Sequence, residues 1–148
     1  MVNKPSSVDL HRFPIFRGLS ATNLEEVRRI LHEKNIAAGE FITREGEHGD
    51  AMYLLLAGRV EVSKSLTLMT GRNNLNTRDK SLVVLRAEDA PYFGEMALLK
   101  EDSSRTATVK TLEECTVGLI RRKDFIALCE SDTGLGYRLL LNIARTLV

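Results

Sequence analysis

The 148-residue sequence is poor in residues that build metal centres and disulfide frameworks, and it has no long apolar stretch. Its two cysteines, Cys115 and Cys129, lie among apolar residues rather than in a spaced framework, so we interpret them as reduced core residues of an intracellular protein. No apolar run approaches the roughly 18 residues of a membrane helix, and the opening MVNKPSS lacks the apolar centre of a signal peptide. We therefore expect a soluble, cytoplasmic domain with no membrane insertion, which a membrane protein could carry as a cytosolic part.

An excess of charge of either sign is also missing, because 21 Lys and Arg residues stand against 20 Asp and Glu residues. The formal net charge of +1 argues against a dedicated nucleic-acid-binding protein, which is usually strongly basic. No recognition helix is visible in the sequence, so we expect no direct binding of nucleic acid within this chain.

Histidine is scarce, with three residues in the chain. A metal-dependent enzyme on a β-roll needs several histidines and a carboxylate around one metal, and these histidines do not form such a pattern. The acids beside His48 fit a surface turn better than a metal site. We expect no catalytic residue, no metal and no cofactor, and thus a protein that is not an enzyme.

The chain is long enough for one domain with a substantial core. A domain of this length buries roughly 68–70% of the surface of its unfolded chain. With 43% hydrophobic and 28% charged residues, the sequence has the composition of an ordinary soluble globular protein.

The apolar residues first follow a helical spacing and then alternate. Thr22 and Glu25 fit a capping box at the start of a helix. One face of this helix is apolar: Leu24, Val27, Ile30 and Leu31. From Ile36 onward the pattern predicts short strands joined by turns, with a long polar hairpin connection over 66–80. The expected strands are 41–42, 52–56, 59–63, 82–85, 106–112 and 116–120. We expect a mainly β fold with flanking helices, a double-stranded β-helix or jelly roll.

The C-terminal part returns to helical spacing. Arg122 opens a helix with Phe125 facing inward, and the polar residues 131–134 break it. A second helix carries an apolar stripe: Leu135, Leu139, Leu140, Ile143, Ala144 and Leu147. This stripe could pack on the strands or on a second copy of the chain, so a homodimer stays open.

Residues 93–99, followed after a short loop by 105–109, have the chemistry of a pocket for a sugar phosphate. Gly94 lets a ligand approach the main chain closely, and a short helix after it would aim free N–H groups at an anion. Glu95 could accept hydrogen bonds from a sugar hydroxyl, and the fork of Arg105 matches two phosphate oxygens. Each residue alone has a simpler explanation, such as a tight turn or a surface ion pair worth roughly 0–1 kcal/mol. Together they favour a ligand contact.

The string FGEMALL, followed by a loop and RTATV, closely resembles the phosphate-binding cassette of the cyclic nucleotide-binding domain family. The likeness continues in PIFRGLS, EGEHGDAMYLLLAGRVEV and RRKDF. It implies an N-terminal extension over 1–12 and a cyclic nucleotide-binding domain over 13–148. Within this domain it implies a β-roll over about 36–120 and C-terminal helices over about 122–148.

The resemblance implies that the ligand is cAMP or cGMP. Glu95 would accept the ribose 2′-hydroxyl and Arg105 would pair with the cyclic phosphate, while backbone N–H groups complete the cradle. The implied ligand-binding residues are Phe93, Gly94, Glu95, Met96, Ala97, Arg105, Thr106, Ala107, Val62 and Leu82. A residue with a hydroxyl group directly after the arginine, here Thr106, resembles the pattern of family members that prefer cGMP. Members with a hydroxyl at this position also bind cAMP.

Two departures from the family pattern stand out. Residues 87–91, AEDAP, replace the usual Gly-Asp turn before the cassette. Relatives often continue into a long lid helix or a DNA-binding helix-turn-helix, whereas this sequence stops within one helix of the roll, so either a short lid closes the site or the lid is missing.

The implied function is regulatory: ligand capture moves the C-terminal helices and so signals to an effector domain or partner protein. The alternative is a ligand-free, degenerate member of the same fold that acts as a protein interaction module.

Overall fold

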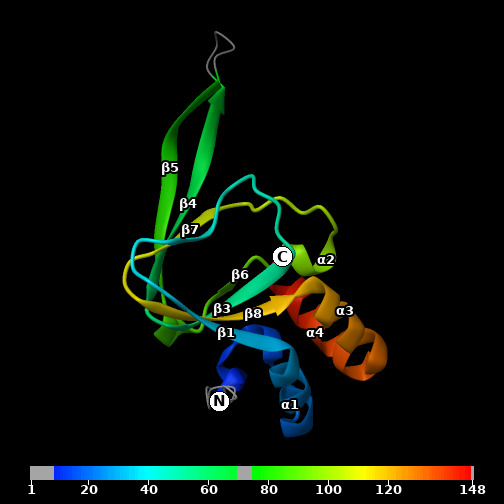
Figure 1. Ribbon diagram of the computed structural model, residues 1–148. Helices are drawn as coiled ribbons and strands as arrows, with labels where there is room; N and C mark the ends of the chain where they lie inside the picture. The colour runs from blue at the N-terminus through cyan, green and yellow to red at the C-terminus, as the bar shows by residue number, and fades with distance from the viewer. Residues whose placement is uncertain (1–8, 70–74, 148) are drawn as a thin grey trace.

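Two antiparallel four-stranded sheets form a β-roll in the described part of the chain (Figure 1). The computed structural model describes residues 9–69 and 75–147. The sheets have the strand orders β1-β8-β3-β6 and β2-β7-β4-β5. The strands are β1 Leu31–Ile36, β2 Phe41–Thr43, β3 Ala51–Ala57, β4 Arg59–Met69, β5 Leu75–Arg86, β6 Tyr92–Phe93, β7 Thr108–Thr111 and β8 Cys115–Arg121. The expected fold class, mainly β with flanking helices, is confirmed.

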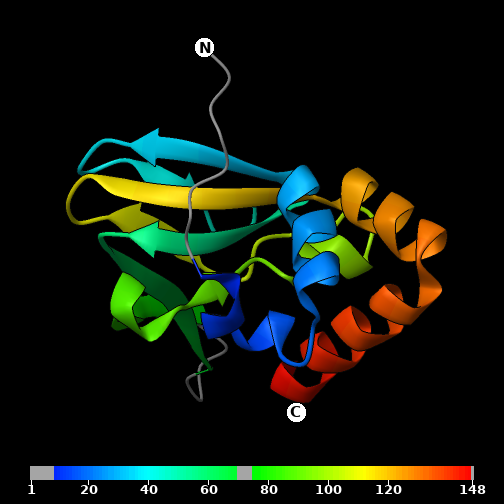
Figure 2. The same ribbon diagram turned by 90° about the horizontal axis from the view of Figure 1, so that it is seen from below.

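Except for the short helix after β5, the helices lie together beside the roll (Figure 2). The helices are η1 Leu10–Arg12, η2 Pro14–Phe16, α1 Ala21–Ile30, η3 Ala87–Asp89, α2 Met96–Leu99, α3 Arg122–Ser131 and α4 Thr133–Leu147. Helix α3 is central in this layer, because it contacts α1, α2 and α4 as well as β8. Within the described residues, none of these helices has the length and apolar character needed to cross a membrane.

Two apolar cores follow from the alternation of side chains along β3. Met52 and Leu54 belong to a core between the sheet and the helices, together with Phe125 of α3. Tyr53 and Leu55 face the other way, into the interior of the roll. Strand β3 is therefore apolar on both faces, and it connects the roll interior to the helical layer.

The N-terminal residues pack against the rest of the domain. Leu10 is fully buried in the helical core, and the Arg12 guanidinium donates to the carbonyls of Ala87 and Glu88 at 3.2 and 2.6 Å. The boundary expected between an extension over 1–12 and a domain over 13–148 stays a prediction. These contacts favour including η1 in the domain.

Helix α1 starts with a different cap from the expected one. The Ser20 hydroxyl accepts from the Asn23 N–H at 3.1 Å, and the Asn23 side chain accepts in return from the Ser20 N–H. The expected box of Thr22 and Glu25 is therefore wrong. The helix also ends at Ile30, and the chain continues directly into β1, which pairs with β8. Residues 31–36 thus form a strand because they pair with a strand far away in the sequence. The local pattern did not predict this strand.

The expected hairpin over 66–80 is confirmed, but most of this stretch is strand and not connection. Strand β4 continues to Met69 and β5 begins at Leu75, and the two form a hairpin that projects from the roll (Figure 1). Residues 70–74 lie outside the described residues. Main-chain hydrogen bonds of the hairpin ladder need no apolar alternation, which explains why the sequence pattern missed these strand residues. Strands β2, β3, β7 and β8 lie within two residues of their expected ranges.

Helix α4 buries only part of its expected stripe. The buried members are Leu135, Leu139 and Ile143. The exposed members are Leu140, Ala144 and Leu147, so only part of the stripe packs within this chain. Asn142 lies on the buried side instead, and its Nδ2 donates to the carbonyls of Ile15 and Arg17, each at 2.9 Å.

Replacing Asn142 with alanine is expected to lower the free energy of unfolding by about 1–3 kcal/mol, because it leaves carbonyls of the N-terminal segment without a donor. Chemical denaturation measures the change. Asn35→Ala is the control, because Asn35 is exposed and its side chain accepts from the Thr116 hydroxyl at 2.9 Å. Its expected effect is within about 0.5 kcal/mol. Equal effects of the two substitutions would contradict the role of the buried amide.

Candidate functional site

The residues expected to bind the ligand begin where β6 ends. Gly94 has φ +80°, a conformation that favours glycine, and it turns the chain from Phe93 into α2. The Gly94 carbonyl accepts from the N–H of Ala97 at 3.1 Å and from Nη1 of Arg105 at 3.4 Å. The short helix expected after Gly94 is confirmed. The Ala97 N–H is already bonded in this arrangement, so its expected part in an anion cradle is not supported.

The guanidinium of Arg105 faces the inside of the roll. Its central carbon lies 5.6 Å from the centre of the Tyr53 ring, which belongs to the roll interior. Two main-chain hydrogen bonds hold Arg105 in place: its N–H donates to the Glu47 carbonyl at 2.7 Å, and its carbonyl accepts from the Gly46 N–H at 2.8 Å. The loop over 45–50 therefore positions the arginine.

Arg105 forms no ion pair with the acids that the structure describes. The simpler explanation, a surface pair with Glu101 or Asp102, is thus not realised. A half-buried cation without a carboxylate partner is suited to bind an anion from outside the protein.

Gly49 leaves the space that this side chain occupies. A Cβ atom at Gly49 would overlap the guanidinium of Arg105, and one at Gly94 would lie 2.6 Å from its Nη1. From the sequence, the segment around His48 was expected to be a surface turn, with no role for Gly49. The sequence shows that this loop has a second glycine, Gly49. It does not show that Gly49 lies against Arg105, 56 positions later, because the tertiary fold brings the two residues together.

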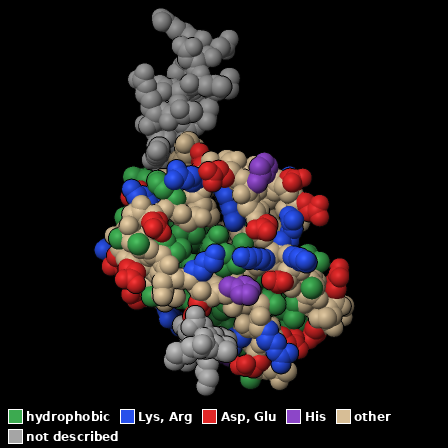
Figure 3. Space-filling view, in the orientation of Figure 1, with side chains coloured by type: hydrophobic (Ala, Val, Ile, Leu, Met, Phe, Trp, Pro, Cys, Tyr) green, Lys and Arg blue, Asp and Glu red, His purple; other side chains and the backbone are tan. Residues whose placement is uncertain are grey.

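A small hollow lies in front of Arg105. Its lining residues are Gly94, Glu95, Met96, Ala97, Ser103, Ser104, Arg105 and Thr106. Its volume is about 40 Å³, which exceeds the ~10–15 Å³ that a cavity needs to hold one water molecule. The hollow therefore suits a small anionic group, and the rest of a larger ligand would extend along the roll. The space-filling view shows apolar side chains in the middle of this face, with Lys and Arg side chains beside them (Figure 3).

Phe93 and Ala107 do not line this hollow. The Phe93 ring stacks on Tyr53 inside the roll, with ring centres 5.5 Å apart and planes at 22°. The Ala107 carbonyl accepts from the Thr43 hydroxyl at 3.1 Å. Both residues flank the hollow and fix its surroundings.

Val62 and Leu82 were both expected to bind the ligand, but they lie on opposite faces of their sheet. Val62 pairs with Val83 and Val109 and packs against the roll interior, whereas Leu82 pairs with Ser63. Side chains alternate along a strand, so Leu82 points to the outer face, where it is 60% exposed. Val83 takes the inner position, because a slip of one residue in the register exchanges the two faces.

Glu95 lies between the hollow and α4. It lines the hollow with Arg105 and also a second surface depression with Tyr92 and Thr146. The Tyr92 hydroxyl donates to Oγ1 of Thr146 at 2.6 Å and so links β6 to the last turn of α4. Burial raises the pKa of Tyr92, and the nearby Glu95 carboxylate adds to this shift.

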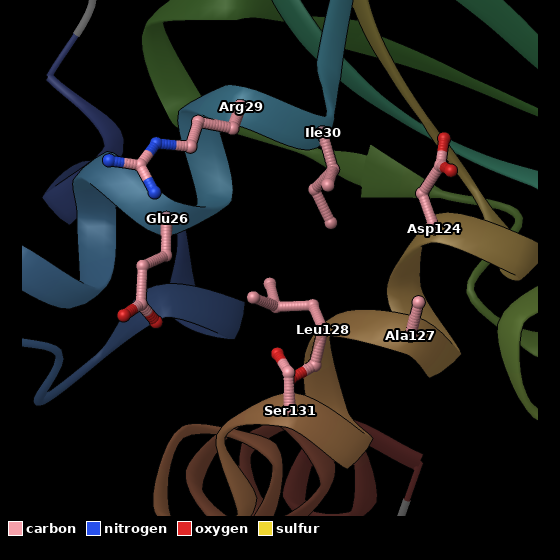
Figure 4. Close-up of a pocket in the computed structure, with 7 residues that line it drawn as sticks. All are labelled: Glu26, Arg29, Ile30, Asp124, Ala127, Leu128 and Ser131. Atoms are coloured by element: carbon pink, nitrogen blue, oxygen red, sulfur yellow. The ribbon is translucent and has the colours of Figure 1, made fainter.

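A larger cavity of about 420 Å³ lies between α1 and α3, away from these residues (Figure 4). Ile30 and Leu128 point toward each other across it, whereas Arg29 points away. Burial and a hydrogen bond with Asp132 raise the pKa of Glu26, and one buried Glu26 oxygen has no hydrogen-bond partner among the described residues. The polar groups of this cavity do not converge on a common point, so we do not take it as the site.

Comparison with known proteins identifies the family. The model of the cyclic nucleotide-binding domain matches residues 33–132. A cyclic nucleotide-gated potassium channel of Rhizobium etli is 35% identical over 119 residues, which are 80% of this chain and 29% of the channel. The chain spans less than a third of the bacterial potassium channels that it matches.

Solved structures agree in fold. The N-terminal domain of a transcriptional regulator from Streptomyces coelicolor has a TM-score of 0.73 and 25% identity, over 93% of this chain and 89% of that one. The regulatory domain of Toxoplasma gondii PKA, crystallised with cAMP, has a TM-score of 0.65 and 27% identity, over 94% of this chain and 48% of that one. By sequence and by fold, this chain belongs to the cyclic nucleotide-binding domain family.

Proposed function

We propose that this chain is a regulatory module that binds cAMP or cGMP and couples binding to movement of α3 and α4. The observation that carries the proposal is the inward-facing guanidinium of Arg105, half-buried and without an ion pair among the described acids, in front of a hollow sized for a small anion. The cyclic phosphate would pair with Arg105, and Glu95 would accept the ribose 2′-hydroxyl. The amides of Met96 and Thr106 would complete the contacts to the phosphate.

The base and sugar would lie along the inner face of the roll. Val62 and Val83 are paired there, so they are the proposed apolar contacts. Thr106 is exposed at the rim of the hollow, where its hydroxyl could bond the amino group of guanine. This feature is compatible with cGMP as well as cAMP.

Two contacts support coupling to the helices. Leu98 of α2 is fully buried in the same core as Phe125 of α3 and Ile143 of α4, and Tyr92 is hydrogen-bonded to Thr146 of α4. A shift of α2 around a bound phosphate would therefore act directly on α3 and α4. Such a switch works only if the ligand has different affinities for the two arrangements.

A second candidate function is a ligand-free interaction module. Its support is the exposed face of α4, where Tyr137 is 66%, Leu140 44% and Leu147 48% exposed. An effector domain or a second copy of the chain could dock on this face.

Titration with cAMP and cGMP side by side, by calorimetry and by thermal unfolding, tests the proposal. A ligand at 100 times its dissociation constant is expected to add about 2.7 kcal/mol to the free energy of unfolding. If neither nucleotide gives binding heat or a shift in the unfolding temperature, the sensor function is refuted and the interaction module is favoured.

A further inference from the structure

The guanidinium of Arg105 is turned into the roll, although few contacts hold it there. Its hydrogen bond to the Gly94 carbonyl is long, at 3.4 Å, beyond the usual range of N–H···O bonds. It has no ion pair with a described acid. The adjacent Gly49 and Gly94 leave it room but contribute no side chain that could attract it.

Among the described residues, the ring of Tyr53 also contacts the guanidinium of Arg105. The guanidinium carbon of Arg105 lies over this ring, 5.6 Å from its centre, within the distance at which a cation is attracted by an aromatic face. The Tyr53 ring is itself fixed, because it stacks on Phe93, directly opposite on the neighbouring strand β6. Phe93 precedes Gly94, so one aromatic stack joins the start of the cassette to its arginine.

We propose that Tyr53 is a positioning residue of the anion site, whose ring face holds the guanidinium of Arg105 inward before the ligand arrives. Arginine has many rotamers, and a ligand that must first order this side chain loses affinity. The ring contributes through its face and not through its hydroxyl. This inference rests on the proposed function for its effect on affinity, but the contact itself can be measured without a ligand.

The first test uses the ligand-free protein. In NMR spectra, the Arg105 Nε–Hε signal should carry a ring-current shift in the wild type. Tyr53→Phe should keep this shift, because the ring remains, and Tyr53→Leu should lose it. Tyr137→Leu is the control for loss of a tyrosine elsewhere, since Tyr137 is 66% exposed on α4. An unchanged Hε signal in a folded Tyr53→Leu variant would overturn the proposal, whether or not the protein binds a nucleotide.

The second test measures affinity for cAMP and for cGMP by calorimetry. Tyr53→Leu should weaken binding roughly 3- to 30-fold, corresponding to about 0.6–2 kcal/mol, while Tyr53→Phe should bind like the wild type. In the background of Arg105→Ala, Tyr53→Leu should have no further effect, because Tyr53 acts through the arginine. Additive losses in the double variant would overturn the positioning role. If the wild type binds neither nucleotide, the proposed function fails, and the NMR result still decides the Tyr53 contact.

Discussion

Replacing Arg105 with alanine is expected to weaken the binding of cAMP or cGMP by about two orders of magnitude or more. The loss of one partner of a desolvated charge pair costs roughly 2–5 kcal/mol, and each 1.4 kcal/mol is about a factor of ten in affinity. Arg105 is half-buried and is the one basic residue among the described residues that line the hollow. No other described arginine is therefore placed to bind the phosphate there. Calorimetric titration of each nucleotide measures the change.

The matched control is Arg17→Ala, which removes an exposed arginine far from the hollow and should leave affinity unchanged. Arg105→Lys should give an intermediate loss, because lysine keeps the charge but lacks the planar fork that engages two phosphate oxygens. If the Arg105→Ala variant is folded and binds as tightly as the wild type, the assignment of the phosphate site is wrong.

Replacing Gly49 with alanine is expected to weaken binding about 10- to 100-fold, up to the loss expected on removing Arg105. The added methyl group would occupy the place of the guanidinium, so Arg105 must leave its inward position. Gly49 does not have a positive φ, so its backbone conformation does not require glycine. Gly94→Ala would combine an overlap with the strain of φ +80°, which makes Gly49 the cleaner test.

The Gly49→Ala substitution should lower the affinity for the nucleotide without a comparable loss of stability. Gly49 lies in a loop at the surface, so the free energy of unfolding should change by less than about 1 kcal/mol. Gly134→Ala is the control, since the nearest atom to its added methyl group is 3.6 Å away and belongs to Asp132. Wild-type affinity in Gly49→Ala would show that the inward position of Arg105 is not required for binding.

Much of the architecture could be predicted from local patterns. The strands β2, β3, β7 and β8, the break between α3 and α4, and the short helix after Gly94 all follow from alternation, helical spacing and turn residues. These signals are local, because each depends on residues a few positions apart. The family could likewise be recognised from one short string around Glu95 and Arg105, and the match of the family model agrees.

Other features depend on contacts between distant residues. Residues 31–36 form a strand because β8 pairs with them, and Val83 rather than Leu82 faces the roll interior because of the register with β4. Residues 82–85 are all apolar, so alternation within this strand does not select the inner face. The environment of Arg105 is of the same kind, since Gly49 and Tyr53 lie more than 50 positions before it in the chain.

The amino-acid sequence alone thus determined the mainly β class, most strand positions and the residue types expected to grip a phosphate and a sugar. Only the tertiary structure decided which neighbours aim those residues: a glycine that leaves room, an aromatic ring beneath the cation, and a valine rather than a leucine on the inner face. The physical reason is distance along the chain. Residue type carries charge, shape and local propensity, whereas the direction of a side chain depends on strand pairing and packing between segments far apart in sequence.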